Sequence, residues 1–397
     1  MEPLRDKLFA LLNDREEKMI EIRRHLHQHP ELSFKEAETS AYLQSFYKDK
    51  DVKLHLNLNG QHGFVVEIQG NGPGKTIALR ADFDALPIRE EAAVDFRSDN
   101  DGVMHACGHD AHSAYLVMLA DALIELKNEW SGTIKIVHQH AEEVPPGGAL
   151  DILQSGVLDD VDEIYGIHLF PSIDTGIIEV LAGAAFAGRS NFDISIQGLG
   201  GHAAMPQHTK DALVAGAHLV TTLQTVVSRR TDPSESLVIT VGAFEAPGGY
   251  NVIQDHVTLK GTIRYLNSDL KSFAKQEIQR IANGIAATFD VEVDVKVVDD
   301  YPTLYNDTQT TEAVKAALSN SEGQYFTTLQ EGKKMMGSED FAHYLTRIPG
   351  TFFIVGSRPD GMKTPYFNHH PKFVINEKSL LISAKSLGEV VLHRLTN

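Results

Sequence analysis

The chain has 397 residues, of which 42% are hydrophobic and 23% charged, which fits an ordinary globular protein with a large core. Its formal net charge of −18 at pH 7 disfavours nucleic acids and anionic membrane surfaces as partners, because their phosphates would be repelled. No apolar run approaches the roughly 20 residues of a transmembrane helix, and the N-terminus lacks a signal-peptide pattern, so we expect a cytoplasmic protein.

The first half of the chain alternates short β-rich runs with helical segments. Helical periodicity runs from residue 4 to residue 27 and stops before Pro30, because the residue before a proline is disfavoured in a helix. A further helix is expected over residues 111–127. The expected strands are residues 63–69, 76–81, 133–139 and 163–168. Strands that alternate with helices predict a largely parallel or mixed sheet covered on both faces, which is an α/β fold.

A second pattern begins near Arg189. Residues 191–197 alternate as a strand, and a Gly-rich turn leads into a helix over residues 210–229. The pattern continues with strands at 237–244 and 257–266, a helix that Ser268 can cap and that runs to about residue 288, and a strand at 291–297. This β-α-β-β-α-β order is that of the ferredoxin-like unit.

After Asp300 the chain returns to helix, strand and helix, and it ends on an amphipathic helix over residues 377–395. The simplest arrangement is a catalytic α/β domain interrupted by an inserted ferredoxin-like domain. We expect the catalytic domain to comprise residues 1–186 and 299–397, and the inserted domain to comprise residues 187–298.

Two short segments carry the strongest chemical signals. Cys107, the single cysteine, lies two residues before His109 at the start of a helix, so its thiolate and the imidazole can point at one metal ion. The alternative is a half-buried cysteine near surface histidines. Glu142 and Glu143 follow a strand and point in different directions, so one can bind metal while the other reaches a bound water. An ordinary charged loop is the alternative for this pair.

Further candidates have equally plain alternatives. His168 closes an apolar strand, where a single histidine is more often a hydrogen-bonded core residue. Asp82 and Asp84 follow a strand, where capping or turn formation is the ordinary role, and His369 could belong to a polar turn. In open α/β sheets, however, functional groups collect beyond the carboxyl ends of strands, which is where most of these residues are expected.

The number of candidate ligands favours two metal ions. Five side chains exceed the four ligands of a structural zinc site and the usual three of a catalytic one. Two ions that share a bridging ligand fit five side chains. The five candidates are Cys107, His109, Glu143, His168 and His369.

With these residues in place, the sequence resembles the aminoacylase, hippurate hydrolase and auxin-conjugate amidohydrolase branch of the co-catalytic metallopeptidases. The resemblance spans nearly the whole chain in the family's order. It is carried by residues 23–34 (RRHLHQHPELSF), 80–88 (RADFDALPI), 105–110 (HACGHD), 141–143 (AEE), 200–206 (GGHAAMP), 261–264 (GTIR), 337–341 (GSEDF) and 369–371 (HHP).

The resemblance implies roles for the catalytic domain. Cys107 is expected to bridge two ions, Glu142 to act as the general base, and Asp84 to belong to the catalytic residues. The implied ligands besides Cys107 are His109, Glu143, His168 and His369.

For the inserted domain, the resemblance implies a lid and dimerisation domain. There His202 is similar to the family's histidine that reaches the developing oxyanion, often across a dimer interface. Asn251 and Arg264 resemble groups that could hold a substrate carboxylate. A homo-oligomer, either a dimer or a tetramer, is therefore expected.

Some histidines fall outside this pattern. His140 stands where the family commonly has proline, with His138 two residues earlier, and they could alter either the substrate pocket or the side chains behind the ligands. Asn376 lies where an aspartate is frequent. His25 and His29 have the i,i+4 spacing of a helical metal site, but the ligands are already accounted for, so we expect a structural role for them.

The expected reaction is hydrolysis of the acyl-amide bond of a small N-acyl amino acid, such as an N-acetyl amino acid, or of a similar conjugate. Two divalent ions, manganese or zinc with cobalt as an alternative, would outweigh the Cys107 thiolate and the Glu143 carboxylate and attract a substrate carboxylate. A di- or aminopeptidase of the same fold is the alternative and would need a site for a free α-amine. A catalytically idle metal-binding protein is disfavoured, because it would not need the base Glu142.

Overall fold

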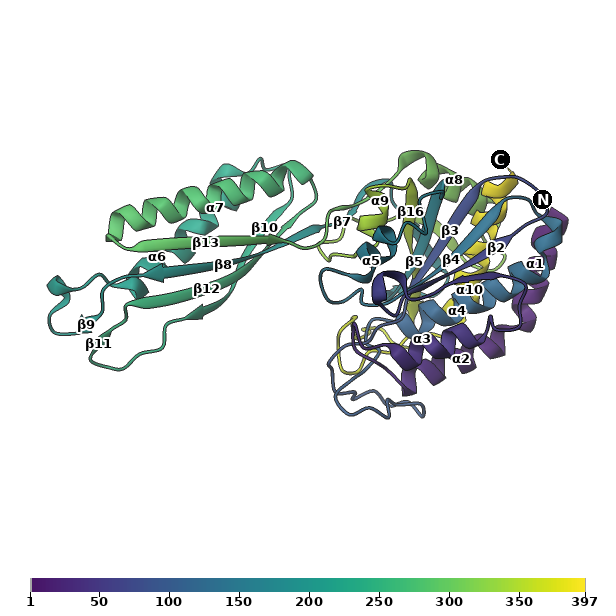
Figure 1. The fold of residues 1–397 in the computed structure, drawn as a ribbon, viewed down its shortest axis with the longest axis horizontal. Helices are drawn as coiled ribbons and strands as arrows, with labels where there is room; N and C mark the ends of the chain where they lie inside the picture. The colour runs from purple at the N-terminus through teal and green to yellow at the C-terminus, as the bar shows by residue number, and fades with distance from the viewer. Residues whose placement is uncertain (1, 397) are drawn as a thin grey trace. The chain divides into compact units, whose positions relative to one another are not determined.

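The computed structural model describes residues 2–396, which form two compact units (Figure 1). Unit 1 comprises the chain up to Gly183, residues Tyr305–Lys333 and the chain from Asp340 onward. Unit 2 comprises Ala184–Leu304 and Lys334–Glu339. Unit 2 therefore interrupts unit 1 in the chain. No helix among the described residues is long and apolar enough to cross a membrane.

Unit 1 is built on an eight-stranded sheet in the order β1-β2-β4-β3-β5-β16-β6-β15. Strand β3 pairs in parallel with β4 and β5, and β5 pairs in parallel with β16, whereas β2 is antiparallel to both of its neighbours. The strands are β1 (Lys53–His55), β2 (Phe64–Gln69), β3 (Thr76–Asp82), β4 (Thr133–Gln139), β5 (Glu163–Asp174), β6 (Ile177–Val180), β15 (Thr328–Glu331) and β16 (Gly350–Arg358). The predicted mixed α/β sheet is confirmed.

Helices cover both faces of this sheet. α4 (His109–Glu125) and α10 (Lys378–Thr396) pack on the central strands from one side, and α5 (Gly148–Gln154) and α9 (Ala342–Leu345) lie together on the other (Figure 1). α4 is apolar around most of its circumference, which suits a helix buried between the sheet and other helices. The other helices of unit 1 are α1 (Glu2–Asp14), α2 (Glu16–Gln28), α3 (Ala37–Ser45), η1 (Leu58–Gly60), η2 (Lys127–Glu129) and α8 (Thr308–Ser319).

Two details of unit 1 differ from the sequence prediction. The helical periodicity of residues 4–27 is divided between two helices, which are separated at Arg15, after an Asn-Asp pair of low helix propensity. The break lets α1 pack mainly on α10 while α2 packs mainly on α4. Strand β5 does not end at His168 but continues to Asp174, because β16 pairs alongside it there, with Ile354 opposite His168.

Unit 2 contains a four-stranded antiparallel sheet in the order β10-β12-β8-β13, against which α6 and α7 pack. Alternate residues of β8 are buried, as its sequence predicts, and Phe192, Ile194 and Ile196 join the core of the unit. Asn267, not Ser268, caps α7, since its side chain accepts the Asp269 amide. The elements are β8 (Gly188–Gln197), β9 (Gly201–His202), η3 (Pro206–His208), α6 (Ala212–Thr225), η4 (Val226–Arg230), β10 (Leu237–Glu245), β11 (Val252–Ile253), β12 (His256–Tyr265), α7 (Ser268–Phe289) and β13 (Glu292–Asp299). Two further strands, β7 (Gly183–Phe186) and β14 (Leu304–Asn306), lie where the chain passes between the units.

Candidate active site

The strand register of unit 1 brings the candidate residues to one edge of the sheet. Asp82, the last residue of β3, lies opposite Gln139, the last residue of β4. Arg80 lies opposite Gly166 of β5, so the same parallel register sets His168 level with Asp82. The segments that follow β3 and β4 carry Asp84 and the two glutamates, which therefore emerge beside His168.

The five predicted metal ligands lie in overlapping groups. The ligand atoms of Cys107, His109 and His168 lie within 4.8 Å of one another, and so do those of Cys107, Glu143 and His369. A third such group joins His109 to Glu143 and to Glu142, the predicted base. Cys107 belongs to the first two groups, which is the geometry that a bridging ligand requires.

A left-handed glycine separates Cys107 from His109. Gly108 has φ +94°, a conformation that is unfavourable for residues with a Cβ atom. The chain turns there directly into α4, and His109 is the first residue of that helix. The turn explains how two residues so close in sequence both direct ligand atoms to one place.

Hydrogen bonds fix which ring nitrogens are free to bind metal. His109 Nδ1 lies 3.1 Å from the carboxylate of Asp84, an acceptor, so Nδ1 carries a proton and Nε2 is the nitrogen left to face a metal ion. That Nε2 atom is buried and has no hydrogen-bond partner. His168 Nδ1 likewise donates to the carbonyl of Leu169 at 3.0 Å, while its Nε2 lies 3.4 Å from Cys107 Sγ. Both histidines have the arrangement typical of metal ligands.

The donor set fits divalent cations. A thiol, imidazole nitrogens and carboxylates together suit zinc, manganese or cobalt. The bare, buried Nε2 of His109 costs free energy unless a partner reaches it, and a cation is the partner that the surrounding acidic groups favour. These residues therefore fit a metal centre without rearrangement of the histidine tautomers.

Asp84, predicted as a catalytic residue, holds two of the candidate ligands. Its carboxylate accepts from His109, from the Glu143 backbone N–H at 3.0 Å and from the Ser33 hydroxyl at 2.7 Å. Burial would raise the pKa of Asp84, but these donors outweigh it and lower the pKa below its usual value. Asp84 is thus held as an anion in contact with two of the candidate ligands.

A second buried network, which sequence reasoning did not assign, lies behind Glu142. The Arg80 guanidinium donates to Asp82 at 2.6 Å and to Asp340 at 2.8 Å, and Asp82 also receives a bond from His112 at 2.7 Å. The backbone N–H of Asp340 donates to Glu142 at 3.4 Å. His112 was detectable, because it follows His109 by three residues on the same face of a helix.

The two departures at β4 lie in the core. The His138 ring is fully buried and stacks on Phe64. Its Nε2 atom shares a 2.8 Å hydrogen bond with the Tyr47 hydroxyl. His140 is also buried, with Nε2 3.3 Å from Asp151. The hydrogen bonds of the two histidines go to Tyr47 and Asp151, and neither of these is a candidate metal ligand.

Unit 2 brings together two of its three predicted residues. His202 of β9 pairs with Val252 of β11, next to Asn251, whose carbonyl accepts from Ala203. Arg264 lies near the opposite end of β12, eight residues beyond His256, which corresponds to roughly 27 Å along a strand. One copy of the chain therefore does not bring Arg264 next to Asn251.

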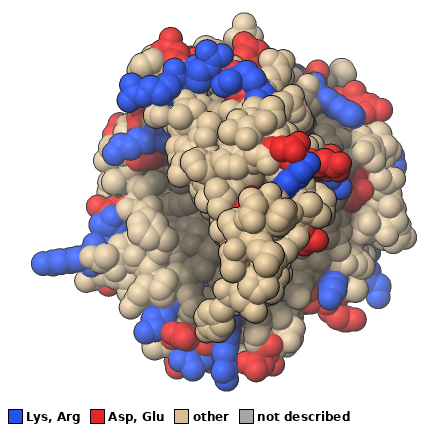
Figure 2. Space-filling model, turned by 90° about the vertical axis from the view of Figure 1, so that its left-hand side faces the viewer, with Lys and Arg blue, Asp and Glu red and all other residues tan. Residues whose placement is uncertain are grey.

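The loops around β9 and β11 are apolar and exposed. Figure 2 looks onto the end of Figure 1 that carries these strands, and most side chains at the centre of this view are uncharged. The exposed apolar side chains in these loops are Leu199, Met205, Tyr250 and Val252. Exposed apolar groups gathered in this way usually mark a contact surface.

The fold and the site together define a class. The chain belongs to Peptidase family M20/M25/M40, whose pattern matches residues 78–393. It is 41% identical to the N-acyl-L-amino acid amidohydrolase of Geobacillus stearothermophilus over 285 residues, which is 71% of this chain and 76% of the relative. It is 36% identical to the N-acetyl-L-cysteine deacetylase of Bacillus subtilis, over 95% of this chain and 88% of the relative.

Solved structures agree with this assignment. A crystal structure of a protein from methicillin-resistant Staphylococcus aureus, described as an aminohydrolase, superposes with a TM-score of 0.93 at 46% identity and covers 98% of this chain and 99% of its own. The YxeP protein of Bacillus subtilis, a dinuclear metal-binding peptidase of the M20 family, gives a TM-score of 0.83 at 30% identity over 97% of this chain and 99% of its own. The protein is therefore a metal-dependent hydrolase of amide bonds.

Proposed function

We propose that this protein hydrolyses the acyl-amide bond of N-acyl amino acids, with two divalent cations and with Glu142 as general base. The observation that carries the proposal is the pair of ligand groups that share Cys107, with Glu142 beside them. A structural site would need neither the shared thiol nor an adjacent carboxylate outside the ligand set. The names of the amidohydrolase and deacetylase relatives support the substrate class.

In this proposal Cys107 would help to hold both ions, because it belongs to two of the ligand groups. His109, Glu143, His168 and His369 complete the set. When bound, the cations polarise the scissile carbonyl and make an attacking water more acidic. Manganese or zinc suits these donors, with cobalt as the alternative.

Glu142 moves the proton. Its carboxylate takes a proton from the attacking water and delivers it to the nitrogen of the leaving amine, a contribution of typically 10²–10⁴ in rate. The Asp340 backbone N–H donates to one Glu142 carboxylate oxygen at 3.4 Å and so helps to orient the carboxylate. The buried Arg80–Asp340 bond fixes that N–H in turn.

We infer that unit 2 is an inserted ferredoxin-like lid and dimerisation domain. The strand order β10-β12-β8-β13 and the two helices support this fold. His202 donates a hydrogen bond to the developing oxyanion, where loss of one donor typically costs about 100- to 1,000-fold in rate. His202 is exposed and belongs to the apolar end of the unit, as expected of a residue that meets substrate on closure.

A homo-oligomer, dimer or tetramer, is part of the proposal. Asn251 and Arg264 are assigned to the substrate carboxylate. Because they lie far apart within one chain, both can contact the same carboxylate only if they come from two copies of the chain. The edge strand β10 presents Val238 and Phe244 as exposed apolar side chains, which supports a subunit contact. A cytoplasmic location also belongs to the proposal, because a reducing compartment keeps the Cys107 thiol free.

The experiment that tests this function is amine release from N-acetyl amino acids, N-benzoyl amino acids and free dipeptides, with manganese or zinc restored to the apo-protein. The proposal expects turnover of the blocked amino acids. Turnover confined to free dipeptides would instead support a di- or aminopeptidase of the same fold.

A further inference from the structure

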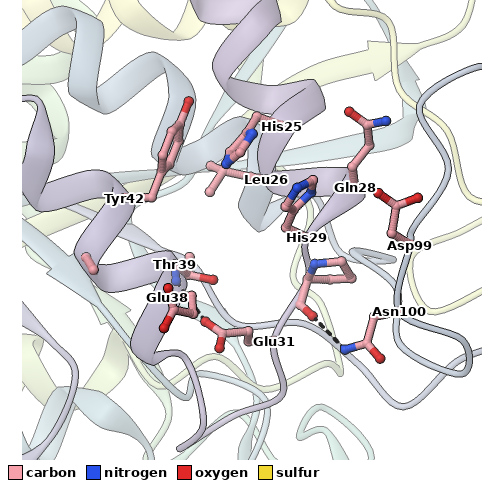
Figure 3. A pocket seen from close by; sticks show the side chains of 12 residues that line it. His25, Leu26, Gln28, His29, Glu31, Glu38, Thr39, Tyr42, Asp99 and Asn100 are labelled. Atoms are coloured by element: carbon pink, nitrogen blue, oxygen red, sulfur yellow. Dashed lines mark hydrogen bonds between the residues drawn. The ribbon is translucent and has the colours of Figure 1, made fainter.

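The last turn of α2 borders a pocket of about 600 Å³, and none of its lining residues belongs to the candidate active site (Figure 3). Two histidines one helical turn apart, His25 and His29, line this pocket, and Tyr42 of α3 lies beside His25. The ring centroids of the two histidines are 4.5 Å apart, and those of His25 and Tyr42 are 4.0 Å apart. The two imidazoles therefore share one face of the helix at a spacing that suits a single ion.

The polar atoms of these two rings have no protein partner. Within residues 2–396, no ring nitrogen of His25 or His29 makes a hydrogen bond or an ion pair. His27, on the other face of the same helix, differs, since its nitrogens lie 2.9 Å from Asp110 and 3.1 Å from Glu90. Both ring nitrogens of His27 thus have polar partners, whereas the rings of His25 and His29 make ring contacts only.

Charge in the pocket favours a cation. Its lining residues include Glu31, Glu38 and Asp99 but no lysine or arginine. Burial and the neighbouring His29 lower the pKa of His25, which favours the neutral imidazole, the form that has a lone pair for coordination. Neutral imidazoles among carboxylates are the donors that zinc, copper and nickel prefer.

We propose that His25 and His29 bind a divalent transition-metal ion at this pocket, separately from the catalytic ions. Water molecules complete the coordination, and the pocket carboxylates attract the cation. The ion cross-links the last turn of α2, beyond which the Glu31 carbonyl accepts from Ala85 and the Ser33 hydroxyl donates to Asp84. It therefore stabilises the turn that precedes the contacts with the active-site loop.

The test is a titration of the full-length holoenzyme with Ni²⁺, followed by dialysis and metal analysis. Wild type is compared with the double variant His25→Gln/His29→Gln and with His256→Gln, a matched exposed histidine on β12 without an i,i+4 partner. We expect wild type and His256→Gln to retain one ion more per chain than the double variant. Ni²⁺ should raise the Tm of wild type more than that of the double variant.

Each single variant, His25→Gln or His29→Gln, should weaken Ni²⁺ binding by at least about tenfold, because one of two chelating ligands is lost. Hydrolytic activity measured before the titration should be the same in all variants, which shows that they fold. Equal nickel content and equal Tm shifts in wild type and the double variant would overturn the proposal, as would loss of the additional ion from His256→Gln.

Discussion

Replacement of Asp84 by asparagine tests how the ligands are positioned. Asparagine keeps the shape of the side chain but turns one acceptor oxygen into an NH₂ donor. If the NH₂ faces His109, it opposes the Nδ1 proton and leaves only the Asp84 backbone carbonyl, 3.0 Å away, to accept that proton, which weakens the hold on the ring. If it faces Glu143, it opposes the backbone N–H and displaces that ligand. Either orientation damages the metal centre.

The magnitude follows from one lost hydrogen bond to a charged group, which is worth about 1.5–3 kcal/mol. At about 1.4 kcal/mol per factor of ten, metal affinity should fall about 10- to 100-fold, the range usual for partners of metal ligands. Affinity is measured by competition with a chromogenic chelator. Ser33→Ala is the control, because it removes one donor and leaves both ligand contacts intact. Unchanged metal affinity in Asp84→Asn, or an equal loss in Ser33→Ala, would refute the reasoning.

Three further changes probe other parts of the structure. Cys107→Ala should lose the bound metal because it removes the shared ligand, and unchanged stoichiometry on metal analysis would exclude the bridge. Gly148→Ala should destabilise the fold by about 1–3 kcal/mol, because its Cβ would lie 1.9 Å from the His140 carbonyl oxygen; an unchanged Tm would contradict this. Hydrogen bonds from Arg280 and then Arg230 lower the pKa of Glu277 from 4.5 to about 2. The Glu277 carboxylate therefore stabilises the folded protein fully above pH 4.5, and this contribution is lost as the pH falls toward 2. The gap in urea stability between wild type and Glu277→Gln should therefore narrow over that range, and a constant gap would count against the ion pairs.

Local patterns in the sequence predicted most of the elements of the fold. The alternating sequence of β8 reflects burial of one face, and the apolar sequence of α4 reflects burial around most of the helix. Both patterns can be recognised without knowledge of the tertiary structure. The break at Arg15 was not predicted because amphipathic periodicity continues across it, whereas α1 packs mainly on α10 and α2 mainly on α4. The continuation of β5 past His168 depends on pairing with β16, about 190 residues later in the chain.

The candidate site likewise contains residues that the sequence predicted and residues that it did not. Residue type and spacing pointed to Cys107 and His109, because a thiol and an imidazole beside a helix start are chemically distinctive. The hydrogen bonds of Asp84 could not be predicted from the sequence, because an aspartate after a strand ordinarily caps a turn. Its three donors come from segments that are distant along the chain. Asp340 stayed unassigned for a similar reason, because it contacts Glu142 through its backbone, which no residue type reveals.

The central claim is that Glu142 acts as a base beside a metal centre that it does not help to hold. The most direct test is one preparation of Glu142→Ala, analysed for metal content and for turnover of an N-acetyl amino acid that wild type hydrolyses. The account predicts metal content equal to that of wild type and a loss of turnover of about 10²–10⁴. Near-normal turnover, or loss of metal together with activity, would contradict it.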